Sequence, residues 1–130
     1  MGSIKFIGRI HSSLKEIKDC PLQESEGAPE AVIIIDAEYR KAMTGLVKGA
    51  KIVLLTWLDK GDRAVLETKP RNNLNAKTRG VFASRSPDRP NPIGLHETEI
   101  VEIADDGQIR VSKLEVLDGT PLIDIKIALD

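Results

Sequence analysis

Short runs of apolar residues recur along the chain, and most of them have the pattern of β-strands. Between residues 4 and 10, apolar side chains alternate with charged ones, which predicts a half-buried first strand. Segments 31–35 and 51–58 are continuous apolar runs rich in β-branched residues, which is typical of buried strands. Similar patterns predict further strands at 63–67, 80–84, 96–103, 108–117 and 122–127.

Two of these strands are joined by a hairpin turn. Asp105-Asp106-Gly107 separates 96–103 from 108–117 and has the composition of a tight turn. The alternation in both strands changes phase midway, at 100–101 and near Lys113, and a β-bulge in each would account for the change. The last strand divides its side chains between two faces: Ile123, Ile125 and Ile127 on one, and Leu122, Asp124 and Lys126 on the other.

One stretch between the strands has the period of a helix. Asp36 stands at the position of an N-cap, and Gly49 fits the left-handed position that follows a helix C-terminus. Between them Tyr39, Ala42, Met43 and Leu46 form one apolar face. Short strands with one inserted helix predict a mainly β fold. We expect a small single-sheet β-barrel with one inserted helix, forming one domain over residues 1–130.

The composition agrees with a soluble domain of this kind. The chain has 130 residues, of which 41% are hydrophobic and 30% are charged, so it can bury a core of its own. Its longest apolar run is far shorter than the roughly 18 residues that span a bilayer, so we expect a cytoplasmic protein without a membrane partner. Cys20 is the only cysteine, and His11 and His96 lack neighbouring ligands, so no metal is expected.

Charge is unevenly distributed along the chain, although the net charge is only −1. Residues 69–89 contain six basic side chains and one acidic one, which gives this basic window a local charge of +5. A solvated loop would explain the window, and so would a patch that binds an anionic ligand or RNA phosphates. The basic residues are Lys69, Arg71, Lys77, Arg79, Arg85 and Arg89.

Residues 80–95, Gly-Val-Phe-Ala-Ser-Arg-Ser-Pro-Asp-Arg-Pro-Asn-Pro-Ile-Gly-Leu, contain three prolines within six positions. Each proline fixes its own φ and pushes the preceding residue out of the helical region, so this segment should be stiff. A stiff loop loses little entropy when it binds a ligand, and the guanidinium groups of Arg85 and Arg89 suit carboxylates and phosphates. The alternative is a rigid crossover whose arginines pair with the acidic C-terminal third.

A second unusual segment is 115–126, Glu-Val-Leu-Asp-Gly-Thr-Pro-Leu-Ile-Asp-Ile-Lys. Asp118 can cap its own turn, and Asp124 and Lys126 share one face of the following strand. On an open surface such a pair contributes little to stability. At the mouth of a barrel the same pair would hold a zwitterionic ligand.

The two segments resemble the motifs of the TsaA-like (TrmO-like) family. Residues 83–95 and 117–126 match its two main motifs, and residues 7–12, Ile-Gly-Arg-Ile-His-Ser, match its first strand. The resemblance spans nearly the whole chain and implies a small β-barrel that binds S-adenosylmethionine. It further implies a homodimer that methylates N6 of threonylcarbamoyl-adenosine next to the tRNA anticodon.

The resemblance also implies site residues. By position, the cofactor contacts are Leu22, Gln23, Glu24, Asp59, Lys60, Arg85, Leu95, Ser112, Lys113, Leu114 and Glu115. Methyl transfer from a sulfonium depends on positioning, so it requires neither a nucleophilic side chain nor a metal. A carboxylate, Asp118 or Asp124, would accept the proton that the substrate nitrogen loses. Substrate contacts are expected from Arg89, Asn91, Lys126, Lys69, Arg71, Lys77 and Arg79.

Two other functions fit the same residues. One is an S-adenosylmethionine-binding sensor or regulatory module without tRNA activity, and the other is a methyltransferase that acts on an unrelated amine. The balanced net charge favours the sensor, as does segment 125–128, Ile-Lys-Ile-Ala, where the family often has Ile-Lys-Pro-Tyr. The basic window favours the tRNA enzyme.

Overall fold

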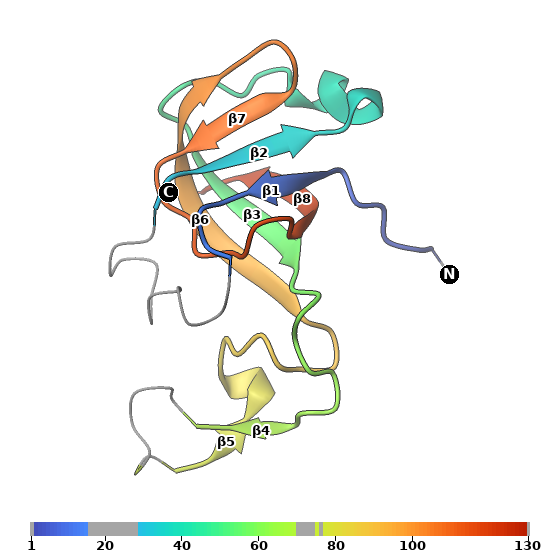
Figure 1. Ribbon diagram of the computed structural model, residues 1–130, viewed down its shortest axis with the longest axis vertical. Coiled ribbons are helices and arrows are strands. Elements are labelled where there is room, and N and C mark those ends of the chain that lie inside the picture. The colour runs from blue at the N-terminus through green and yellow to red at the C-terminus, as the bar shows by residue number, and fades with distance from the viewer. Residues whose placement is uncertain (1, 16–28, 70–74, 76, 130) are drawn as a thin grey trace.

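Six strands surround one hydrophobic core in the computed structural model, which describes residues 2–15, 29–69, 75 and 77–129 (Figure 1). They are β1 (Gly8–His11), β2 (Ala31–Ile35), β3 (Lys51–Trp57), β6 (Ile93–Ile103), β7 (Gln108–Val111) and β8 (Pro121–Ile127). Neighbours pair antiparallel in the order β1-β2-β7-β6-β3-β8, and β8 also pairs with β1, which closes the barrel. The predicted mainly β architecture is confirmed.

A second, two-stranded sheet, which the sequence analysis did not predict, lies outside the barrel. β4 (Glu67–Thr68) pairs with β5 (Arg79–Gly80), and this β4–β5 ribbon lies beyond one end of the barrel (Figure 1). The strands predicted at 63–67 and 80–84 are therefore reduced to short pieces. Beyond Gly80 the chain turns into η4 (Val81–Ala83), a short 3₁₀ helix.

The inserted helix is also shorter than its apolar pattern predicts. η3 (Ala37–Met43) is a 3₁₀ helix, and the Asp36 side chain makes no capping hydrogen bond. Tyr39 and Met43 pack against the barrel core, which stabilises a helix of this length more than intrinsic propensity does. Gly49 adopts the expected left-handed conformation, with a φ of 89°. Within the described residues, no helix is long and apolar enough to cross a membrane.

The core consists of the inward-facing side chains of the strands. Its largest fully buried members include Ile10, Ile33, Ile52, Leu54, Ile100 and Ile109. The bulge predicted in the first hairpin strand is confirmed, because the register between β6 and β7 shifts between Ile100 and Glu102. The second bulge, predicted near Lys113, is wrong, because β7 ends at Val111 and Lys113 lies beyond the strand.

The predicted two-faced pattern of the last strand is wrong. Leu122 is fully buried and Ile125 packs against the core, whereas Ile127 is 56% exposed. The cause is a register shift between Leu55 and Thr56, where β3 pairs with β8. An irregularity of this kind changes the phase of alternation, so the two ends of β8 present different sets of residues to the core.

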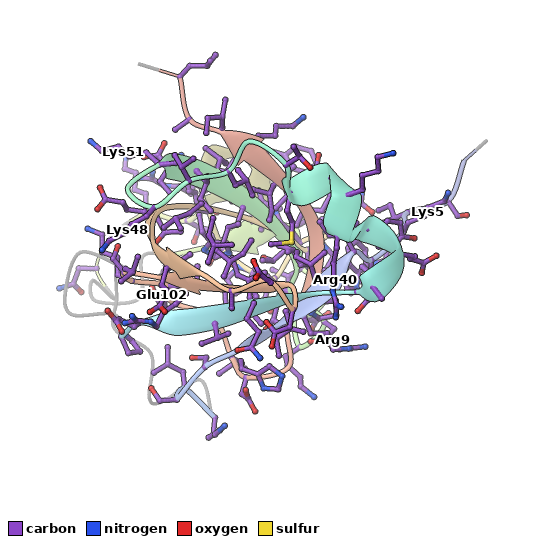
Figure 2. All side chains as sticks on the ribbon, turned by 90° about the horizontal axis from the view of Figure 1, so that it is seen from above. Lys5, Arg9, Arg40, Lys48, Lys51 and Glu102 are labelled. Carbon is purple, nitrogen blue, oxygen red and sulfur yellow. The ribbon has the colours of Figure 1, made fainter. Side chains whose placement is uncertain are left out.

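Charged side chains extend outward from the barrel, as Figure 2 shows for Lys5, Lys48 and Lys51. Arg110 of β7 bridges two carboxylates: its Nη2 lies 2.6 Å from Glu102 Oε2 and its Nη1 lies 3.0 Å from Glu30 Oε1. Ion pairs as exposed as these contribute little to stability. The fold therefore depends on its core and its strand pairing.

The turn before β8 fastens the end of β1. The backbone N–H of Asp118 donates to the carbonyl of Leu14 at 2.8 Å. Its carboxylate accepts the N–H of Ser12 at 2.9 Å and lies 2.9 Å from Lys15 Nζ. Lys15, and after it the Ser12 N–H, hold the pKa of Asp118 below its ordinary value. The backbone and the side chain of Asp118 therefore both tie residues 12–15 to the C-terminal segment.

Replacing Asp118 tests this attachment. Asp118→Ala should lower the free energy of unfolding by about 1 kcal/mol near neutral pH, because the Ser12 N–H and Lys15 both lose a partner. A carboxyl pKa that is depressed on folding stabilises the protein above the unfolded value, and the contribution is lost as pH falls through the folded value. Urea unfolding should therefore show that the difference in free energy of unfolding between wild type and Asp118→Ala is smaller at about pH 2.5 than at about pH 7. Asp118→Asn is the control, because it keeps an acceptor for Ser12. A gap of equal size at both pH values would contradict the ionic role.

Candidate functional site

An open groove of about 1870 Å³ runs along β6 and reaches the β4–β5 ribbon. Its walls come from the loop that follows β3, from residues 93–99 of β6, from residues 112–117 and from the proline-rich loop, residues 84–92. Pockets for small cofactors are typically about 300–1,000 Å³. The groove therefore has room for a cofactor together with part of a second molecule.

Many of the predicted site residues meet in this groove. Antiparallel pairing of β3 with β6 places the loop after Trp57 beside the start of β6, because Trp57 is opposite Ile93. The predicted cofactor and substrate residues that line the groove are Asp59, Lys60, Arg85, Leu95, Ser112, Lys113, Glu115, Arg89, Lys69 and Arg79. Residues far apart in the sequence are thus brought to one surface.

The two carboxylates expected to accept a proton lie in other surroundings. Asp118 follows the lining residue Leu117, but its carboxylate contacts Ser12 and Lys15. Asp124 lines a small hollow of about 160 Å³ beside η3, and its Oδ2 lies 3.6 Å from Lys126 Nζ. The expected zwitterion-binding pair is thus present as an ion pair, but neither Asp118 nor this pair lines the groove along β6.

Other predicted residues also lie outside the groove lining. Leu114 is fully buried in the core, and its N–H donates to the Pro29 carbonyl at 3.0 Å. Asn91 Oδ1 lies 3.3 Å from Arg63 Nη2, and Lys77 is exposed ahead of β5. Leu22, Gln23, Glu24 and Arg71 lie outside the described residues.

Hydroxyl and carboxylate groups within the proline-rich loop fix its shape. Ser84 Oγ accepts the N–H of Ser86 at 3.3 Å, and Ser86 Oγ accepts the N–H of Asp88 at 3.1 Å. Asp88 Oδ1 in turn accepts the N–H of Asp62 at 2.8 Å, which joins the loop to the segment that follows β3. Together with the fixed φ angles of the prolines, these local bonds leave the loop few alternative conformations.

The two arginines of the loop differ in what they contact. The Arg89 guanidinium donates to the carbonyls of Val81 and Ser84, with Nη1 3.3 Å from Ser84 O, so it stabilises the turn around η4. Arg85 is exposed in the groove and has no hydrogen-bond or ion-pair partner in the described part of the chain. A guanidinium held this way on a stiff loop suits a carboxylate or phosphate. The expected alternative, in which both arginines pair with acidic residues, does not describe this loop.

His96 also lines the groove, although the sequence analysis assigned it no role. It is buried, and its Nε2 lies 3.0 Å from Thr56 Oγ1. Gly94 makes room for this pair, because a Cβ at that position would lie within 2.6 Å of both atoms. A histidine at an inward position of a strand was the available sequence signal. Across the described residues, no group of three His, Cys, Asp or Glu side chains is arranged to hold a metal.

Comparison with known proteins identifies relatives over nearly the whole chain. Residues 9–129 match the family model of the tRNA-methyltransferase O N-terminal domain. A probable S-adenosyl-L-methionine-binding protein of Methanothermobacter thermautotrophicus is 42% identical over 123 residues, which cover 95% of this chain and 87% of that protein. An S-adenosyl-L-methionine-binding protein of Archaeoglobus fulgidus is 38% identical, with coverage of 95% and 86%.

Solved structures of TrmO share the fold. A crystal structure of TrmO from Pseudomonas aeruginosa matches with a TM-score of 0.76 and 28% identity, over 99% of this chain and 55% of that one. A second TrmO structure matches with a TM-score of 0.76 and 27% identity, over 99% and 58%. The chain thus spans a little over half the length of these TrmO chains. The resemblance seen in the sequence is confirmed: the chain belongs to the tRNA-methyltransferase O N-terminal domain family.

Proposed function

We propose that this chain is an S-adenosylmethionine-dependent methyltransferase that acts at N6 of threonylcarbamoyl-adenosine next to the tRNA anticodon. The observation that carries the proposal is the groove along β6. Most of the described residues that the resemblance assigns to the cofactor, from three separate parts of the chain, line this one surface. The names of the relatives, which refer to S-adenosylmethionine binding and to a tRNA methyltransferase, support the same function.

The chemistry of the lining residues suits S-adenosylmethionine, which has a carboxylate, an ammonium, a sulfonium and an adenine ring. Arg85 offers a cation for the carboxylate, and Asp59 and Glu115 place carboxylates in the same groove. Leu95 is 43% exposed and supplies an apolar contact surface. Bound there, the cofactor would supply an activated methyl group, and the task of the chain would be to hold donor and acceptor in line.

The ribbon end of the groove suits an RNA. Lys69 and Arg79 line the groove beside Thr68, and Lys77 is exposed just ahead of β5. A chain with a net charge of −1 has little positive surface to spare, so we also propose a homodimer in which two basic windows act together. A cytoplasmic location is part of the same proposal, because the tRNA substrate is found there.

A sensor that binds the same cofactor without acting on tRNA is the second candidate. Two observations favour it: the curated relatives are named for cofactor binding alone, and the chain spans a little over half of the solved TrmO chains. Incubation of the purified chain with the cofactor and threonylcarbamoyl-adenosine-containing tRNA, followed by nucleoside mass spectrometry, separates the two. A methylated nucleoside supports the enzyme, whereas cofactor binding without product supports the sensor.

Loss of the Arg85 side chain should weaken cofactor binding. We expect Arg85→Ala to raise the Kd for S-adenosylmethionine roughly 10- to 150-fold, because a charge-assisted hydrogen bond is worth about 1.5–3 kcal/mol. Lys60→Ala is the variant for comparison and should weaken binding far less, since Lys60 also lines the groove but carries its charge on a side chain with more freedom. Titration calorimetry and the rise in Tm with ligand provide the measurement. Equal affinities for wild type and Arg85→Ala would remove this residue from the site.

Binding of tRNA should depend on salt through the cations near the ribbon. Neutralising Lys69, Lys77 and Arg79 together should make the slope of log affinity against log salt concentration less steep by up to about 2–3. Each phosphate contact contributes roughly 0.7–0.9 to this slope. The affinity for S-adenosylmethionine should change little. A control variant neutralises an equal number of exposed cations away from the groove, Lys5, Lys41 and Lys48. Identical slopes for the two variants would place the RNA elsewhere.

A further inference from the structure

Phe82 is the most exposed aromatic side chain among the described residues. Phe82 is 86% exposed, whereas its neighbour Val81 is buried and only 2% exposed. Its ring lines the groove at the ribbon end, next to the proline-rich loop. A phenylalanine in water contributes nothing to the core, so the fold does not require an aromatic residue at this position.

The backbone that carries Phe82 is held on both sides. The Val81 N–H donates to the Leu66 carbonyl at 2.9 Å, and the Ser84 N–H donates to the Val81 carbonyl at 3.1 Å. The Arg89 guanidinium also donates to the Val81 and Ser84 carbonyls. The ring therefore extends from a short, braced turn, and holding a flat ligand against it would cost little conformational entropy.

Cations flank Phe82 in sequence and in space. Arg79 of β5 pairs with Thr68, which precedes Lys69, and these three residues line the groove together with Phe82. Arg85 follows three positions after the ring and lines the same groove. An exposed aromatic ring beside a cationic track is the combination that holds single-stranded nucleic acid, through base stacking and phosphate pairing.

We propose that Phe82 is a stacking platform for an unpaired base of the RNA substrate, with Lys69 and Arg79 placed to pair with adjoining phosphates. The inference rests on the proposed tRNA function and assigns the contact that would recognise an unpaired loop. A second copy of the chain is the other possible occupant of this surface. RNA is favoured over a second copy, because the centres of protein interfaces are depleted in lysine, whereas Lys69 lines the same groove as Phe82.

The test uses the full chain and an anticodon stem–loop oligonucleotide. Phe82→Ala should weaken binding of the stem–loop roughly 5- to 150-fold, the effect of losing one stacked base. Phe82→Trp should bind at least as well as wild type, since indole also stacks. Leu66→Ala is the control, because Leu66 directly precedes β4, is 66% exposed and does not line the groove. Fluorescence anisotropy measures RNA affinity, calorimetry measures cofactor affinity, and light scattering measures the mass in solution.

The proposal predicts that Phe82→Ala binds the stem–loop more weakly but binds a fully paired duplex as well as wild type does. Its cofactor affinity and its mass in solution should be unchanged. Wild-type RNA affinity in Phe82→Ala would overturn the inference and leave the proposed function standing. Wild-type protein that binds the cofactor but no RNA would instead overturn the tRNA function, and the inference with it. A fall in mass that accounts for the lost affinity would make the ring a contact between copies and also overturn the proposal.

Discussion

The antiparallel pairing of β3 with β6 is the interaction on which the groove depends. It runs from Lys51 opposite Glu99 to Trp57 opposite Ile93. Since successive residues of a strand advance by about 3.4 Å, this pairing supports a wall of about 20 Å beside the groove. It also places the loop after β3 against the proline-rich loop, where the Asp62 N–H donates to Asp88. Weakening this ladder would therefore separate the groove walls as well as open the barrel.

The proline-rich loop shows how similar side chains take different tasks. Its hydroxyl and carboxylate groups satisfy backbone donors that no strand reaches, and Arg89 satisfies the carbonyls of Val81 and Ser84. Because that guanidinium is used internally, Arg85 remains exposed without having to hold the loop together. A binding group stays in place when other side chains hold its backbone, and the partly buried Arg89 would do this for Arg85.

Local sequence predicted those parts of the fold that local physics determines. Segment 31–35 forms β2 with the predicted bounds, and the phase change at Ile100 marks a real irregularity in the pairing with β7. The inward phase of β8 was missed because it results from a register shift against β3, which no pattern within 122–127 records. η4 was predicted as a strand because Val81 and Phe82 are apolar, although only Val81 is buried. The motifs predicted both Arg85 and Asp118 as site residues. The fold separates them, because the Arg85 guanidinium is exposed in the groove and the Asp118 carboxylate contacts Ser12 and Lys15 instead.

The short distance between Phe82 and Arg85 connects the two proposals for the groove. Three residues of fully extended chain span at most about 11 Å, so the backbone positions that carry the ring and the guanidinium lie close together in the same groove. The turn between them is braced by Ser84 and Arg89, so this spacing is held nearly constant. If Arg85 binds the cofactor and Phe82 stacks a base, both ligands share this groove, and the stacked base would be the reacting nucleotide or one near it in the loop. The braced turn would then set the distance between donor and acceptor, which is the quantity on which an in-line methyl transfer depends.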